Sequence, residues 1–227
     1  MFAGKKALLL DMNSTFMFGE DRFAQSEDFS IHYNNIGGML SSGELTNIIR
    51  LAYEYLSERY PDEKYRHNFP SVEDAIQAVT ERTIQPEEIE KITDTFSFHE
   101  LGHIPQEYVE ALFKLREKFI LSVVIDIWSP KKAWVETFKT SGIDKLFSAS
   151  SFSSDHGMVK PSAKPFELVL NQLKLKKEEC LVIGDSARRD LGGAKAAGID
   201  CILVGGAVDA QALSCFSSLL DLVDEIY

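Results

Sequence analysis

Short apolar runs alternate with amphipathic stretches over both ends of the chain. Mostly apolar runs that are typical of buried strands occupy positions 6–10, 119–127, 146–149, 180–183 and 201–204. Stretches with helical spacing of their apolar residues occupy positions 108–118, 130–140, 165–173 and 190–197. Strands that alternate with helices predict an α/β fold with a doubly wound parallel sheet.

The stretch from about position 19 to 106 lacks this alternation. Helices are expected at 43–60, 71–83 and 86–95. Ser71 suits an N-cap because acidic residues follow it in the first turn, and Pro86 suits an early helical position. We therefore expect residues 17–106 to form a helical insertion, and residues 1–16 and 107–227 to form the sheet-containing domain.

The two predicted parts also differ in net charge. The chain carries a formal charge of −11. Residues 17–106 hold 17 acidic and 7 basic side chains, about −10, whereas the remainder holds 18 and 17, about −1. This excess argues against a nucleic acid or an anionic membrane as partner. No apolar run approaches the roughly 20 residues that a membrane helix needs.

The three cysteines, Cys180, Cys201 and Cys215, are scattered and show neither a disulfide framework nor zinc-binding spacing. The N-terminal residues show no small-residue cleavage site, so we expect no signal peptide. A cytoplasmic protein is expected. The sequence leaves its oligomeric state open.

Polar residues follow two of the predicted strands directly. Asp11 follows the first strand, and Gly184-Asp185-Ser186 follows the strand at 180–183, with Asp190 a few positions on. Lys160-Pro161 precedes the predicted helix at 165–173. Ligands of open α/β sheets bind at the carboxyl ends of the strands. We therefore expect Asp11, Lys160, Asp185 and Asp190 to form one polar site.

This set resembles the haloacid dehalogenase superfamily, whose signature is DxDx[TV], a Ser/Thr, a Lys and GDxxxxD. The resemblance extends from Lys5 to about Gly206. It implies a Rossmann-like core with an inserted helical cap of the C1 type (subfamily I). It also implies Mg²⁺-dependent hydrolysis of a small phosphomonoester through an aspartyl-phosphate.

The resemblance assigns a role to each of these residues. Asp11 is the expected nucleophile, and Lys160 pairs with it and with the transferred phosphoryl group. Asp11, Asp185 and Asp190 are the expected magnesium ligands, together with the backbone carbonyl of Asn13. The expected partner is therefore a small phosphorylated metabolite.

Asn13 departs from the family pattern, which has an aspartate here that protonates the leaving group and then activates water. An amide cannot exchange a proton in this way, and general acid–base catalysis is worth roughly 10²–10⁴-fold. Asn13 thus predicts a slow enzyme unless another acid substitutes. Glu20 or Asp21 could do so, although charged residues at a turn tip need no such role.

The phosphate-binding hydroxyl is ambiguous. Ser129 is the nearest hydroxyl after the second predicted strand, yet Ile125-Asp126 aligns better with the family's Ser/Thr-Asn pair. Ser129 before Pro130 also suits a helix N-cap, and an exposed helix N-terminus can itself bind phosphate.

A second motif, His99-Glu100-Leu101-Gly102-His103, matches HExxH. A zinc site of this type needs both imidazoles on one face of a helix, and Gly102 and Pro105 interrupt such a helix. We expect a hinge, or an edge of the cap that faces the site.

A phosphatase is the leading hypothesis. Asn13 keeps open a phosphate- or metabolite-binding protein with impaired turnover, or a phosphotransferase. A 2-haloacid dehalogenase is disfavoured, because the superfamily's dehalogenases do without the acidic pair formed here by Asp185 and Asp190.

Overall fold

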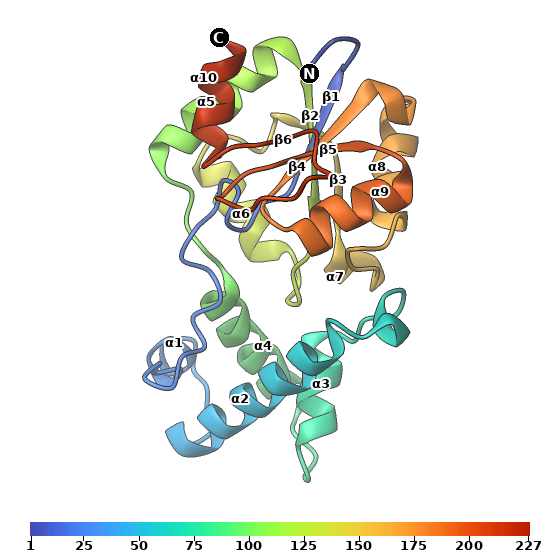
Figure 1. The fold of residues 1–227 in the computed structure, drawn as a ribbon. Coiled ribbons are helices and arrows are strands. Elements are labelled where there is room, and N and C mark those ends of the chain that lie inside the picture. Colours follow the sequence, from blue (N-terminus) through green and yellow to red (C-terminus); the bar gives the residue numbers. More distant parts are fainter.

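A six-stranded sheet lies at the centre of the larger part of the molecule in the computed structural model, which describes residues 1–227 (Figure 1). All neighbouring strands are parallel, in the order β3-β2-β1-β4-β5-β6. The strands are β1 (Ala7–Leu10), β2 (Ile120–Ile125), β3 (Phe147–Phe152), β4 (Cys180–Gly184), β5 (Asp200–Leu203) and β6 (Ser214–Cys215). The predicted α/β class with a parallel sheet is confirmed.

Helices cover both faces of this sheet. One face packs against α5 (Gln106–Lys118), α6 (Lys132–Thr140) and α10 (Leu219–Ile226). The other packs against α8 (Lys164–Leu173) and α9 (Gly192–Ala197). Successive side chains of a strand point to opposite faces.

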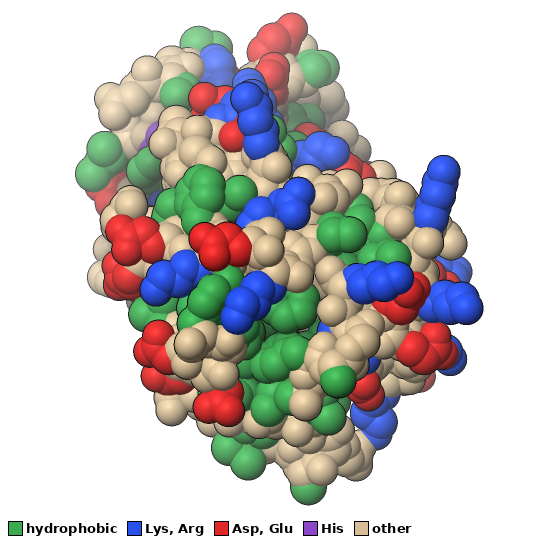
Figure 2. Space-filling model, turned by 90° about the horizontal axis from the view of Figure 1, so that it is seen from above, with side chains coloured by type: hydrophobic (Ala, Val, Ile, Leu, Met, Phe, Trp, Pro, Cys, Tyr) green, Lys and Arg blue, Asp and Glu red, His purple; other side chains and the backbone are tan.

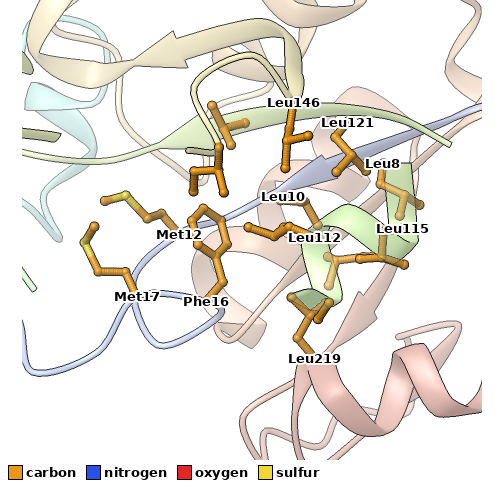
Figure 3. Packing of buried hydrophobic residues seen from close by; sticks show 14 of the residues in the cluster. Leu8, Leu10, Met12, Phe16, Met17, Leu112, Leu115, Leu121, Leu146 and Leu219 are labelled. Carbon is orange, nitrogen blue, oxygen red and sulfur yellow. The ribbon is translucent and has the colours of Figure 1, made fainter. Parts of the chain in front are cut away.

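The first strand shows this alternation directly. Leu8 and Leu10 belong to the hydrophobic cluster on the face covered by α5, α6 and α10 (Figure 3). Ala7 and Leu9 belong to the cluster on the opposite face, covered by α8 and α9. All four residues of β1 are fully buried. Asp11, the first residue after the strand, therefore lies at the carboxyl end of a buried central strand.

The helices between β1 and α5 form a separate group, which we call the helical unit (Figure 1). It consists of α1 (Ser30–Asn35), α2 (Ser42–Arg59), the 3₁₀ turn Glu63–Tyr65, α3 (Val72–Val79) and α4 (Pro86–Glu100). These helices pack around their own hydrophobic cluster, to which Val159 and Trp128 are added from the sheet-containing part. The expected cap of Ser71 is present as a reciprocal capping box with Asp74.

Several elements differ from the expectation. Helix α4 continues to Glu100 instead of 95, because its last turn buries Phe96 and His99 in tertiary contacts. The segment after Asp185 begins with a π-helical turn (Ala187–Leu191) before α9. Further elements were not expected: the helices α1, α7 (Ser153–His156) and α10, the strand β6, and the 3₁₀ turns Glu63–Tyr65 and Lys177–Glu179.

The surface opposite the helical unit is seen from above in Figure 2. Acidic and basic side chains are interspersed there around exposed apolar groups, in line with the near-balanced charge counted for this part of the chain. No helix of the structure has both the length and the apolar character required to span a bilayer.

Candidate active site

Asp11 and Lys160 form a buried ion pair at the carboxyl end of β1. Lys160 Nζ lies 2.5 Å from Asp11 Oδ1 and 2.7 Å from Asp190 Oδ1, and it also donates to the carbonyl of Val124 at 3.3 Å. Burial lowers the pKa of Lys160, but Asp11 and Asp190 outweigh that effect and hold this pKa well above its usual range. Lys160 is therefore a fixed positive charge.

Asp185 and Asp190 approach Asp11 from the loop after β4. Oxygen atoms of the three carboxyl groups lie within 4.8 Å of one another. Asp190 accepts a hydrogen bond from the backbone N–H of Ser186 at 3.0 Å. This bond holds the Asp190 carboxyl group close to the end of β4. A Cβ on Gly184 would lie 2.3 Å from the Asp190 carboxyl carbon, so this approach requires glycine.

The donor set of this cluster fits a hard divalent cation. Burial raises the pKa of Asp11 and of Asp185, and the neighbouring carboxyl groups add to that effect. Asp185 Oδ1 and Asn13 Oδ1 are buried and have no hydrogen-bond partner. The carboxyl groups of the cluster outnumber the cations beside it, Lys160 and Arg189. Oxygen ligands in this arrangement are those that Mg²⁺ prefers.

Thr15 completes the turn that follows β1. Its hydroxyl donates to Asp11 Oδ2 at 3.5 Å, and Ser14 N–H donates to the carbonyl of Met17 at 2.8 Å. Ser14 has a φ of 55°, which this tight turn requires. Its hydroxyl donates to Glu20 at 2.9 Å. Asn13 forms a bridge with Met17 in this turn, and its role at the site stays a prediction.

Ser129 is buried but makes no contact with the acidic cluster. Its backbone N–H donates to Glu100 Oε2 at 2.9 Å, and that of Trp128 donates to Glu100 Oε1 at 2.6 Å. Glu100 thus occupies the N–H groups after β2 that could otherwise receive an anion. The Ser129 hydroxyl has no partner, and its role as a phosphate ligand stays a prediction.

Asp126 directly follows β2, whose last residue, Ile125, aligns with the Ser/Thr of the resembled family and carries no hydroxyl. Asp126 Oδ2 accepts from the backbone N–H of Lys160 at 2.9 Å and from the Tyr60 hydroxyl at 2.6 Å. Tyr60 follows α2, so this contact joins the helical unit to the site. The sequence hinted at Asp126 through the alignment of Ile125-Asp126, but no signal indicated Tyr60.

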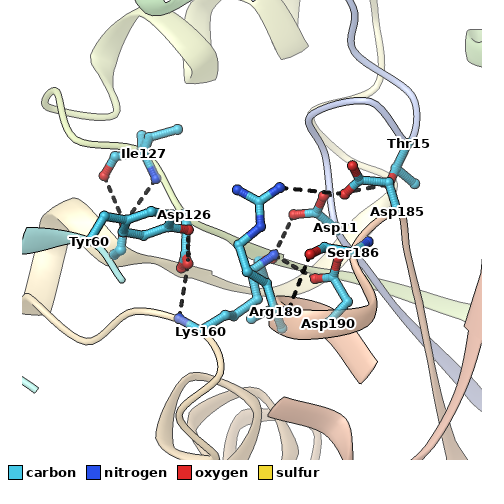
Figure 4. Close-up of polar contacts among 12 residues, drawn as sticks. Asp11, Thr15, Tyr60, Asp126, Ile127, Lys160, Asp185, Ser186, Arg189 and Asp190 are labelled. Atoms are coloured by element: carbon cyan, nitrogen blue, oxygen red, sulfur yellow. Dashed lines mark hydrogen bonds and ion pairs between the residues drawn. The ribbon is translucent and has the colours of Figure 1, made fainter. Parts of the chain in front are cut away.

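Arg189 is a second cation at this site that the sequence analysis missed (Figure 4). Its Nη2 lies 3.8 Å from Asp185 Oδ1, and its Cζ lies 5.9 Å from the centre of the Tyr60 ring. Its position between Asp185 and Asp190, inside the GDxxxxD motif, was the one feature of the sequence that could have indicated it.

The HExxH residues are divided between two elements. His99 and Glu100 lie in the last turn of α4, whereas His103 lies beyond the helix and forms a bridge with Phe18. His99 Nδ1 lies 3.0 Å from Glu27 Oε1. The segment therefore joins the helical unit to the sheet-containing part, and its two histidines do not share one helix face.

Comparisons with known proteins agree with this geometry. A family model of haloacid dehalogenase-like hydrolases matches residues 5–198. Pyrophosphatase PpaX of Halalkalibacterium halodurans is 28% identical over 135 residues, which span 57% of this chain and 62% of PpaX. The match therefore leaves more than a third of that relative outside the alignment.

Solved structures share the fold over nearly the whole chain. A 2-haloacid dehalogenase from Pseudomonas syringae has a TM-score of 0.66 at 18% identity, with 98% of each chain covered. The HAD-hydrolase YfnB from Bacillus subtilis, which was solved bound to magnesium, has a TM-score of 0.61 at 17% identity, again with 98% of each chain covered. At these identities the likeness establishes the fold alone.

Proposed function

Because the chain belongs to the haloacid dehalogenase-like hydrolase family, we propose that it hydrolyses a small phosphomonoester through an aspartyl-phosphate on Asp11. The observation that carries this proposal is the buried cluster in which Lys160 contacts both Asp11 and Asp190, with Asp185 beside them. The three free cysteines suit a reducing cytoplasm as its location.

Asp11 supplies the nucleophile. One of its carboxylate oxygens attacks phosphorus, the bond from phosphorus to the leaving oxygen breaks, and that oxygen takes up a proton. Water then adds to the acyl phosphate, which releases inorganic phosphate and restores the carboxylate. Lys160 holds Asp11 in place and offsets negative charge on the transferred group.

Mg²⁺ is the cofactor that the donor set favours. Asp11, Asp185, Asp190 and the Asn13 carbonyl would hold it, and it would neutralise phosphoryl oxygens when bound. The magnesium bound to YfnB supports this assignment. The excess of carboxyl groups also disfavours a dehalogenase, which would need no such cluster.

We further propose that residues 17–106 act as a C1-type cap over a core of residues 1–16 and 107–227. The separate hydrophobic cluster of the helical unit and the contact of Tyr60 with Asp126 support this division. A cap that closes over the site would exclude water while Asp11 is phosphorylated.

Asn13 favours a second candidate function, a phosphate- or metabolite-binding protein that has lost turnover, or a phosphotransferase whose phosphoenzyme persists. A phosphate-release screen over many phosphomonoesters, with and without Mg²⁺, separates these functions. The proposal expects the wild type to release phosphate only in the presence of Mg²⁺. Asp11→Asn serves as the inactive control. Release by Asn13→Asp alone would instead support the impaired protein.

A further inference from the structure

Four residues separate Asp185 from Asp190, and a π-helical turn at Ala187–Leu191 contains the last three of them together with Asp190. A π-turn fits one more residue into a helical segment and is frequent at functional sites. Here the turn separates two adjacent arginines. Arg188 is exposed and donates to the carbonyl of Pro61 at 2.7 Å, whereas Arg189 is directed into the site.

The Arg189 guanidinium donates no hydrogen bond to the protein. Its one charged contact is with Asp185 at 3.8 Å, beyond hydrogen-bond distance. Figure 4 shows its side chain beside that of Lys160, with the guanidinium directed toward Asp185. A guanidinium carries five donors in a fork that matches phosphate oxygens, and all of those donors are free here.

Few other groups at this site could donate hydrogen bonds to a phosphate. Ile125, at the end of β2, aligns with the family's Ser/Thr and offers phosphate no hydroxyl, and Glu100 occupies the backbone N–H groups of Trp128 and Ser129. A hydroxyl at the end of β2 and free backbone N–H groups after it are therefore both missing as donors to phosphate. Lys160, the other cation in contact with the cluster, already contacts Asp11 and Asp190.

We propose that Arg189 binds the phosphoryl oxygens of the substrate, in place of the hydroxyl that is missing at Ile125. This inference rests on the proposed phosphomonoester substrate and adds a specificity-determining residue to it. The Tyr60 ring, 5.9 Å from the Arg189 Cζ, lies on the segment after α2. Binding of the anion by Arg189 is thereby linked to the position of the helical unit.

The test measures the affinity of inorganic phosphate by isothermal titration calorimetry in the presence of Mg²⁺. It uses the full chain as wild type, Arg189→Gln, Arg189→Lys and the matched control Arg188→Gln. Loss of a charged, two-pronged hydrogen bond should weaken phosphate binding about 10- to 100-fold in Arg189→Gln. Arg189→Lys should recover part of it, and Arg188→Gln should stay within about twofold of wild type.

Equal phosphate affinity in Arg189→Gln and Arg188→Gln would overturn the inference, as would a wild type that binds no phosphate at millimolar concentration. If Arg189→Gln fails to fold, Arg189→Lys must still lose affinity relative to Arg188→Lys. Failure of the proposed function is a separate result: a wild type that binds phosphate through Arg189 but hydrolyses no phosphomonoester.

Discussion

The Tyr60 hydroxyl donates a 2.6 Å hydrogen bond to Asp126 Oδ2, and the same oxygen accepts from the backbone N–H of Lys160 at 2.9 Å. One carboxylate thus joins three segments: the end of α2, the strand end of β2 and the lysine that contacts Asp11. The other carboxylate oxygen, Oδ1, is buried and has no partner. The position of the helical unit and the position of Lys160 are therefore coupled.

Tyr60→Phe should lower the free energy of unfolding by about 1–3 kcal/mol, because it removes one of the two hydrogen bonds of a buried carboxylate. Urea denaturation monitored by circular dichroism provides the measurement. Tyr65→Phe is the matched control, since the Tyr65 hydroxyl forms no hydrogen bond with the protein. Similar losses in both variants would show that the contact with Asp126 contributes nothing specific.

Asp11→Asn should abolish phosphate release and leave the fold intact, because it removes the attacking carboxylate while keeping its size. Asp155→Asn removes an acid that pairs with Lys131 outside the cluster, and it should retain activity. Both variants are assayed with the best ester of the screen. Persistent release by purified Asp11→Asn would exclude Asp11 as the nucleophile.

Mg²⁺ should raise the melting temperature of the wild type, because a ligand that binds only the folded state stabilises it. The rise should shrink in Asp185→Ala, which loses one of the three clustered carboxyl groups. Asp224→Ala removes an exposed acid of α10 as a control. Identical Mg²⁺-induced shifts in wild type and Asp185→Ala would rule out the assigned site.

Glu100 should make stability depend on pH. Burial raises its pKa from 4.5 to about 7, against the hydrogen bonds from Trp128 and Ser129. As pH rises from about 4.5 to about 7, the unfolded chain loses a proton that the folded chain keeps. The free energy of unfolding therefore falls over this window, by an amount on the order of 3 kcal/mol, and levels off above it.

Glu100→Gln should show a smaller fall, because an amide does not titrate, whereas Asp11, whose pKa burial also raises to about 7, still does. Urea denaturation between pH 4 and 8 compares wild type, Glu100→Gln and Glu54→Gln, the last of which changes an exposed glutamate of α2. Parallel pH profiles for wild type and Glu100→Gln would show that Glu100 ionises normally in the folded protein.

The sequence predicted those parts of the molecule that depend on local patterns. The apolar runs located five of the six strands, and parallel strand ends brought Asp11, Asp185 and Asp190 together. The remaining strand, β6, has two residues, too few for any periodicity to show. Helix α1 buries only Tyr33, so it lacks an apolar stripe.

The missed site contacts are tertiary. Glu100 meets Trp128 across 28 positions, and Tyr60 meets Asp126 across 66, so neither pair leaves a periodic or spacing signal. Arg189 differs, because its position inside the motif was visible. What the sequence lacked was the π-turn, which decides which of two adjacent arginines faces the site.

Asn13→Asp should raise turnover about 10-fold or more if the missing proton transfer limits the rate. The amide oxygen of Asn13 is buried and has no hydrogen-bond partner, and a carboxyl group has the same shape as the amide, so it should fit without steric conflict. That group could protonate the leaving oxygen and then activate water for attack on the phosphoaspartate. Hydrolysis of the phosphoenzyme should then accelerate.

Two readouts decide this prediction together. Steady-state kcat should rise, and the fraction of protein trapped as acid-stable phosphoenzyme after quenching should fall. Asn35→Asp, at the end of α1, controls for the added charge. An unchanged kcat with no trapped phosphoenzyme in either form would mean that another acid near the turn, Glu20 or Asp21, already transfers the proton. Glu20→Gln and Asp21→Asn would then be expected to slow the wild type.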